Sequence, residues 1–185
     1  MPLARLLTAV LCLALIGCGI PPLNTATVSQ TPAGAAQFAL AQRAVQACGR
    51  LPDTDAARSA LGRVGLSGDG TIMTSSDQAV IVLMQGGRCA VGLRSMTPEQ
   101  SHQLAQSWVR TYDAISNAEA GDGLSPLVIG AWRSFTPNRR VFIAAHRTWP
   151  NEYSQFPDVA GAAVTLSYTI LGPRSGTPAY TYTLR

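Results

Sequence analysis

The spacing of hydrophobic residues changes part-way along the chain, and this change constrains the fold more than any other feature. In residues 35–48 and 98–115, apolar side chains recur every three or four positions, as on one face of an α-helix. From residue 127 onward they alternate with polar side chains in short runs, as in half-buried β-strands. Helices followed by strands predict an α+β fold with a mostly antiparallel sheet. With 185 residues, 46% of them hydrophobic, the chain is long enough to bury a core.

Helix ends in the first half are marked by capping residues. A first helix over 35–48 is followed by Gly49, and a second, short helix begins at Asp53 or Asp55 and ends before Gly65. The segment Thr97-Pro98-Glu99-Gln100 is typical of a capping box at the start of a third helix. The third helix should bury a continuous stripe of side chains, namely Leu104, Trp108, Tyr112 and Ile115.

The strands are expected in two groups. The first has a short strand over 71–74, a buried strand over 79–84, a Gly86-Gly87 turn, and a strand in which Cys89, Val91 and Leu93 share one face. The second has a hairpin of 127–132 with 141–146, a loop over 148–162, and a hairpin of 164–170 with 180–184.

The N-terminus has the layout of an export signal. Arg5 precedes an apolar run from Leu6 to Ile16, which is shorter than the roughly 20 residues that a membrane span needs. The run ends in Leu15-Ile16-Gly17-Cys18, which resembles the lipobox of bacterial lipoproteins. The resemblance implies cleavage after Gly17 and acylation of Cys18. The alternative is an ordinary signal peptide with a chance cysteine.

This resemblance sets the expected domain organisation and location. Residues 1–17 would be the signal peptide and residues 18–34 a flexible tether. Residues 35–185 would form one α+β domain, with a possible sub-division near 116–126. The protein is expected in the bacterial cell envelope, anchored by lipid and facing the periplasm. Gly19 stands where Asp is the usual inner-membrane retention signal, which favours the outer membrane.

Cys48 and Cys89 remain once Cys12 has left with the signal peptide and Cys18 carries lipid. An even pair in an exported protein predicts a disulfide between them. The alternative is two separate buried thiols. A metal site is not expected, because no further ligands have suitable spacing.

Arginine and aromatic side chains cluster around the expected hairpin of the second half. Such side chains bind phosphate and carboxylate groups or lie at membrane interfaces, so they predict a surface for anionic lipid or an envelope protein. Nucleic acid is not expected as a partner, because the net charge is only +4 and the chain is exported. The alternative is an ordinary solvated hairpin. The surface comprises Trp132, Arg133, Arg139, Arg140, His146, Arg147 and Trp149.

No catalytic motif is present in the sequence, and all fourteen basic residues are arginine. Mechanisms that need a lysine amine are therefore excluded. The leading hypothesis is a lipid-anchored envelope protein with a binding or accessory role, no enzymatic activity and no cofactor. The alternative is a small periplasmic hydrolase in which His146 acts as base beside Ser134 or Ser167.

Overall fold

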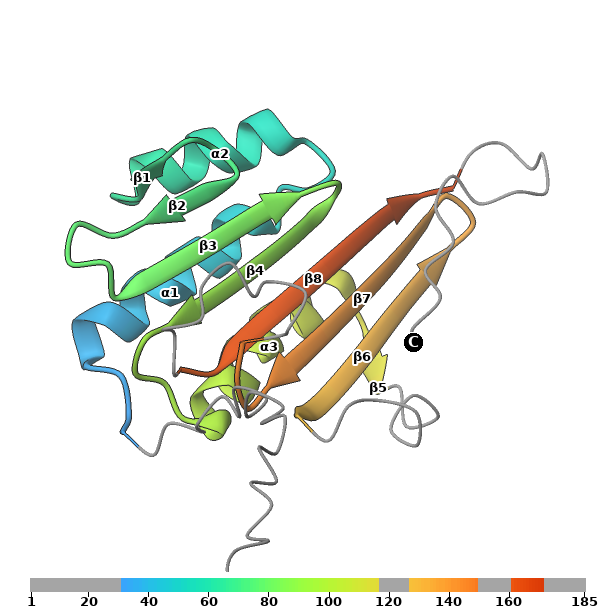
Figure 1. Ribbon diagram of the computed structural model, residues 1–185. Helices are drawn as coiled ribbons and strands as arrows, with labels where there is room; N and C mark the ends of the chain where they lie inside the picture. The colour runs from blue at the N-terminus through green and yellow to red at the C-terminus, as the bar shows by residue number, and fades with distance from the viewer. Residues whose placement is uncertain (1–30, 117–126, 150–160, 172–185) are drawn as a thin grey trace, which may run out of the picture.

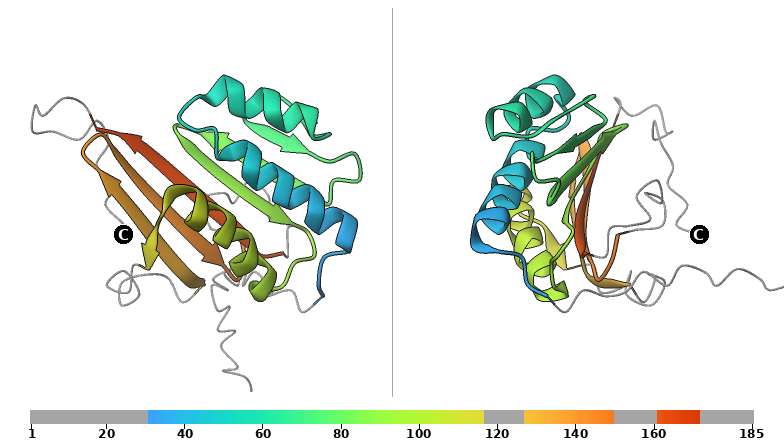
Figure 2. Two further views of the ribbon diagram at one scale, coloured as in Figure 1. Left: turned by 180° about the vertical axis from the view of Figure 1, so that it is seen from behind. Right: turned by 60° about the vertical axis from the view of Figure 1, so that its left-hand side comes forward.

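The protein folds into two layers, with three helices packed on one face of an eight-stranded antiparallel sheet (Figure 1; Figure 2). The computed structural model describes residues 31–116, 127–149 and 161–171. The α+β class expected from the sequence is therefore confirmed. Among the described residues, no helix is both long enough and apolar enough to cross a membrane.

The second and third helices begin where the capping residues indicate. Helix α1 spans Ala35–Cys48, α2 spans Thr54–Arg63 and α3 spans Pro98–Tyr112. The Asp53 carboxylate accepts a hydrogen bond from the Ala56 amide at 2.9 Å, which satisfies a free amide at the start of α2. At the start of α3, Thr97 and Gln100 form the reciprocal capping box.

The third helix is shorter than expected. It ends at Tyr112, because Asp113 takes a left-handed conformation with φ 50° that stops the helix. The prediction that Ile115 continues the buried stripe was therefore wrong. Ile115 instead begins the short strand β5 and is exposed.

The eight strands form one sheet in the order β1-β2-β3-β4-β8-β7-β6-β5, and every neighbouring pair is antiparallel. Gly86 and Gly87 connect β3 to β4, both with positive φ as expected for this turn. Strand β8 lies between β4 and β7, so it joins strands from both halves of the chain. The strands are β1 Ser67–Gly68, β2 Ile72–Thr74, β3 Val80–Gln85, β4 Arg88–Leu93, β5 Ile115–Ser116, β6 Val128–Thr136, β7 Arg139–His146 and β8 Ala163–Ile170.

The main core lies between the helices and the sheet. Trp108 and Tyr112 of α3 are buried there, and each also donates a hydrogen bond to the last turn of α1. The Trp108 indole donates to the Val45 carbonyl at 2.6 Å, and the Tyr112 hydroxyl donates to the Gly49 carbonyl at 3.1 Å. The Val45 carbonyl also accepts a hydrogen bond from the Gly49 amide at 3.1 Å, and Gly49 is the C-terminal cap of α1. The aromatic pair therefore fastens α3 to α1.

The expected disulfide is present. It joins Cys48, at the end of α1, to Cys89 in β4, with the two Cα atoms 6.1 Å apart. Both residues are completely buried in the main core. The bond thus connects the helical layer to the middle of the sheet.

A smaller cluster covers part of the sheet face that carries no helix. Here Trp149 packs with Ile81, Leu83, Ala90 and Ala163. Gly92 makes room for the indole, because a Cβ at this position would lie 2.6 Å from Trp149 Cζ2. A second apolar layer therefore stabilises β3, β4 and β8 from the side opposite the helices.

Several sequence predictions fall outside the described residues. These are the signal peptide, most of the tether, the possible sub-division near 116–126, most of the expected loop over 148–162, and the strand over 180–184 with its hairpin.

We expect the double substitution Cys48→Ala/Cys89→Ala to lower the free energy of unfolding by roughly 4 kcal/mol. The bond closes a loop with a sequence separation of 41 residues, and opening it returns that conformational entropy to the unfolded chain. Denaturant unfolding of the variant and of the oxidised and reduced wild-type protein measures the loss. Equal stability of oxidised and reduced protein would contradict this role.

We expect Gly92→Ala to destabilise the protein by about 1–3 kcal/mol, because its methyl group would collide with the Trp149 ring. A double-mutant cycle with Trp149→Ala provides the control, since removing the ring relieves this collision and leaves a tight contact of 3.0 Å with the Ala162 carbonyl. The cost of Gly92→Ala should fall in that background. An unchanged cost would show that Trp149 does not pack on Gly92.

Candidate functional site

The hairpin of β6 and β7 carries most of the arginine and aromatic residues singled out in the sequence. Successive side chains of a strand point to opposite faces, so neighbours in the sequence are separated in space. The register pairs Arg133 with Phe142 and Phe135 with Arg140, which places these four on the face without helices. Trp132 pairs with Ile143 of the main core and therefore lies on the helix face.

The helix-face members pack against α3. The Trp132 ring lies 5.2 Å from the His102 ring between centroids, and Arg139 Cζ lies 5.5 Å from the centre of the Tyr112 ring. These contacts hold the hairpin against the helix. Trp132 and Arg139 therefore belong to the packing between layers.

Two further members, His146 and Trp149, are buried. Trp149 belongs to the small cluster on the open face of the sheet. The seven residues of the expected surface are thus distributed over both faces and the interior, and Arg133 and Arg140 remain together on the open face.

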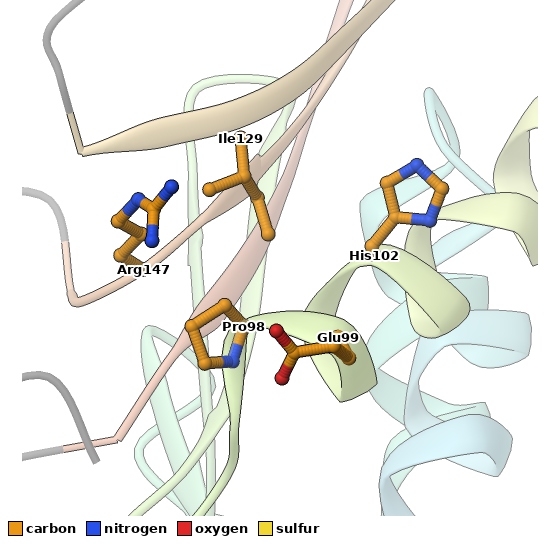
Figure 3. A pocket seen from close by; sticks show the side chains of 5 residues that line it. All are labelled: Pro98, Glu99, His102, Ile129 and Arg147. Atoms are coloured by element: carbon orange, nitrogen blue, oxygen red, sulfur yellow. The ribbon is translucent and has the colours of Figure 1, made fainter. Parts of the chain in front are cut away.

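Arg147 lies beside a shallow hollow of about 290 Å³ that opens to solvent at the first turn of α3 (Figure 3). Glu99 borders the same hollow. Hydrogen bonds from its own amide and from the Thr97 hydroxyl, with a smaller contribution from the nearby Arg147 charge, lower the pKa of Glu99. The Glu99 carboxylate would repel an anion that entered this hollow. The Gln100 amide at the start of α3 is also already bonded to the Thr97 hydroxyl in the capping box. The lining residues are Pro98, Glu99, His102, Ile129 and Arg147.

His146 is held by packing and hydrogen bonds. Its Nε2 lies 2.9 Å from the Thr165 hydroxyl, and its carbonyl accepts a hydrogen bond from the Ser101 hydroxyl at 3.1 Å. Burial away from water disfavours the charged ring and lowers the pKa of His146 to about 4. The ring is therefore neutral at pH 7.

Neither serine considered for a hydrolase lies next to His146. Ala163 of β8 is the residue opposite His146, and Ser167 lies four residues farther along the strand, about 13 Å away. Ser134 pairs with Val141, five residues from His146 along β7, and faces the helix layer. Neither of the two expected serines therefore reaches the His146 ring, whose hydrogen-bond partner in the described structure is the Thr165 hydroxyl.

Within the part of the chain that the structure describes, no three His, Cys, Asp or Glu side chains gather in a way that could hold a metal ion.

Three comparisons with known proteins returned no match: no family model, no curated protein and no solved structure resembles the chain.

Sequence reasoning missed Phe135 and Phe142, which are exposed on the open face beside Arg133 and Arg140. The signal was available in the alternation of the hairpin, because residues two apart on a strand share a face. The sequence prediction instead grouped residues that are adjacent in the chain, such as Trp132 and Arg133, although they lie on opposite faces of the strand.

We expect the free energy of unfolding to fall by about 2 kcal/mol between pH 7 and pH 5 because of His146. The unfolded chain binds a proton near pH 6.5, whereas the folded protein resists it until about pH 4. Stability is therefore complete above the unfolded pKa and is lost as the pH falls through this window. Denaturant unfolding at each pH measures the change.

His146→Gln is the control, since it keeps a side chain that can hydrogen-bond with Thr165 but does not titrate. Its stability should change little between pH 7 and pH 5. A slope equal to that of the wild-type protein would assign the pH dependence to other groups.

Proposed function

We propose that this protein is a lipid-anchored component of the bacterial cell envelope, acylated at Cys18, whose folded part binds a partner and catalyses no reaction. The observation that carries the proposal is the tetrapeptide Leu15-Ile16-Gly17-Cys18 at the end of a short apolar run that follows Arg5. Two or more acyl chains on one residue are sufficient for stable membrane attachment. Gly19 after the acylated residue favours the outer membrane, with the domain facing the periplasm.

The disulfide supports export. Disulfides form and persist in oxidising compartments such as the periplasm, and are rare in the reducing cytosol. The bond between Cys48 and Cys89 is buried and joins two layers of the fold, as a structural disulfide does. This agrees with a chain that leaves the cytosol before it folds.

The arrangement of the side chains favours binding over catalysis. His146 is neutral, buried and engaged with Thr165, so it has the surroundings of a structural histidine. Aromatic and arginine side chains are exposed on the open face of the sheet, and these residue types are enriched where proteins meet partners.

The proposal is tested by Cys18→Ser in cells labelled with radioactive palmitate. We expect the variant to lose the label and to leave the membrane fraction, because the acylated sulfur has been removed. Cys12→Ser is the matched control, since it removes a cysteine of the same apolar run outside the tetrapeptide. That variant should keep both the label and the membrane fractionation.

The mass of the mature chain distinguishes a lipoprotein from a protein with an ordinary signal peptide and an unmodified Cys18. A lipoprotein should begin at Cys18 and carry the added mass of its acyl chains. A chain with an unmodified Cys18, or a Cys18→Ser variant that still sediments with membranes and carries the label, would refute the proposal.

A further inference from the structure

In the described part of the chain, three of the four exposed large hydrophobic side chains lie on one face of three neighbouring strands. Their exposed fractions are 65% for Ile115, 52% for Phe135 and 41% for Phe142. Ile115 lies opposite Arg133, Arg133 lies opposite Phe142, and Phe135 lies opposite Arg140. Directly opposed residues of antiparallel strands share a face. These five residues therefore form one surface, the outer patch, on the open face of β5, β6 and β7.

The apolar and cationic groups of the outer patch are in contact. The rings of Phe135 and Phe142 pack edge to face with their centroids 5.6 Å apart. The guanidinium carbons of Arg133 and Arg140 lie 5.5 and 5.9 Å from the centre of the Phe135 ring. The cations thus surround an exposed apolar centre.

Within the described strands that carry the outer patch, the charged side chains have one sign. Strands β6, β7 and β8 contain no acidic residue, and of their three arginines Arg133 and Arg140 lie on the open face, whereas Arg139 packs over Tyr112 on the helix face. Asp113, the acidic residue nearest to β5 in the sequence, belongs to the C-terminal cap of α3. The surface is therefore complementary to an anionic partner.

The rest of the open face is covered in a different way. Over β3, β4 and β8 the apolar side chains Ile81 and Leu83 are buried beneath Trp149. Among the described residues, apolar exposure on this face is therefore concentrated in the outer patch, at the opposite side of the sheet.

The size of the outer patch favours a lipid surface over a protein. A stable protein interface buries about 800 Å² on each partner, whereas one fully buried aromatic side chain contributes only about 150–250 Å². Three side chains that are already partly covered supply less than such an interface needs. A bilayer requires only a few inserted apolar side chains with cations beside them, particularly when another anchor holds the protein nearby.

The proposed anchor brings the outer patch within reach of lipid. Cys18 is thirteen residues before Thr31, where the described structure begins, and such a segment spans at most about 45 Å. A domain held this close meets the bilayer at a high effective concentration. The open face of the sheet can then lie against the membrane.

From these observations we infer that the outer patch docks on a bilayer containing anionic phospholipid, with Phe135 and Phe142 entering the interface and Arg140 facing the headgroup phosphates. The inference rests on the proposed function in one respect, because the acyl anchor supplies the membrane's proximity. It assigns a second, non-covalent membrane contact to the folded domain.

The test uses the mature protein reconstituted in vesicles of phosphatidylglycerol and phosphatidylcholine whose acyl chains carry bromine, a quencher of tryptophan emission. In Phe135→Trp, we expect the emission added by the new tryptophan to fall about twofold in these vesicles relative to unbrominated ones. Ile170→Trp is the matched control. Ile170 is 56% exposed at the same end of the sheet, but it lies opposite Arg139 and so shares the other face. Its added emission should be unchanged.

The charge requirement is tested separately. Pure phosphatidylcholine vesicles should quench Phe135→Trp much less, and so should Arg140→Gln in the Phe135→Trp background, because both remove attraction between phosphate and guanidinium. Equal quenching in neutral and anionic vesicles, or equal quenching of the two tryptophan variants, would overturn the inference.

Failure of the anchor and failure of the outer patch give different results. A protein that carries palmitate and sediments with membranes, but whose Phe135→Trp emission is not quenched, keeps the proposed function and loses the inference. If the chain carries no lipid, the purified full chain is added to the same vesicles. Quenching of Phe135→Trp emission then supports the docking of the outer patch, and its absence contradicts it. A photo-crosslinker at position 135 that captures protein and no lipid also overturns the inference.

Discussion

The sheet depends on the position of β8 between β4 and β7. This strand hydrogen-bonds along both edges, to β4 over residues 88–92 and to β7 over residues 139–146. Its side chains Val164 and Leu166 are completely buried in the core beneath the helices. Without β8, the strands that precede α3 and those that follow it would have no shared ladder. The disulfide and the hydrogen bonds from α3 to α1 then hold the helical layer to this sheet.

The two faces of the sheet have different surroundings, and this difference decides what each residue of the hairpin can do. Side chains toward the helices are packed, including Trp132 against His102 and Arg139 over Tyr112. On the other face, Trp149 covers side chains of β3, β4 and β8, whereas Ile115, Phe135 and Phe142 of β5 to β7 are exposed. The binding role that we propose therefore falls on one part of one face and not on the hairpin as a whole.

The errors at the candidate surface came from treating neighbours in the sequence as neighbours in space. Alternation along β6 and β7 separates Trp132 from Arg133 and Arg139 from Arg140, and this could have been deduced from the strand period alone. The burial of Trp149 could not, because it depends on the space above Gly92, more than fifty residues earlier. Ile115 was assigned to the wrong element because its spacing continues the helical stripe, whereas the backbone turns at Asp113.

Local interactions are the part of this structure that the sequence by itself determined. Asp53 and Thr97 cap the helices they precede, and Gly86 with Gly87 turns β3 into β4. Each acts within a few residues and depends little on distant partners. The even cysteine pair also indicated a bond across 41 positions, because only two cysteines remained to pair. Tertiary structure alone decided that β8 enters the middle of the sheet, that His146 is neutral and buried, and that Phe135 and Phe142 stay exposed. The physical reason is that strand pairing and burial depend on contacts between residues far apart in the chain, and local sequence patterns do not predict such contacts.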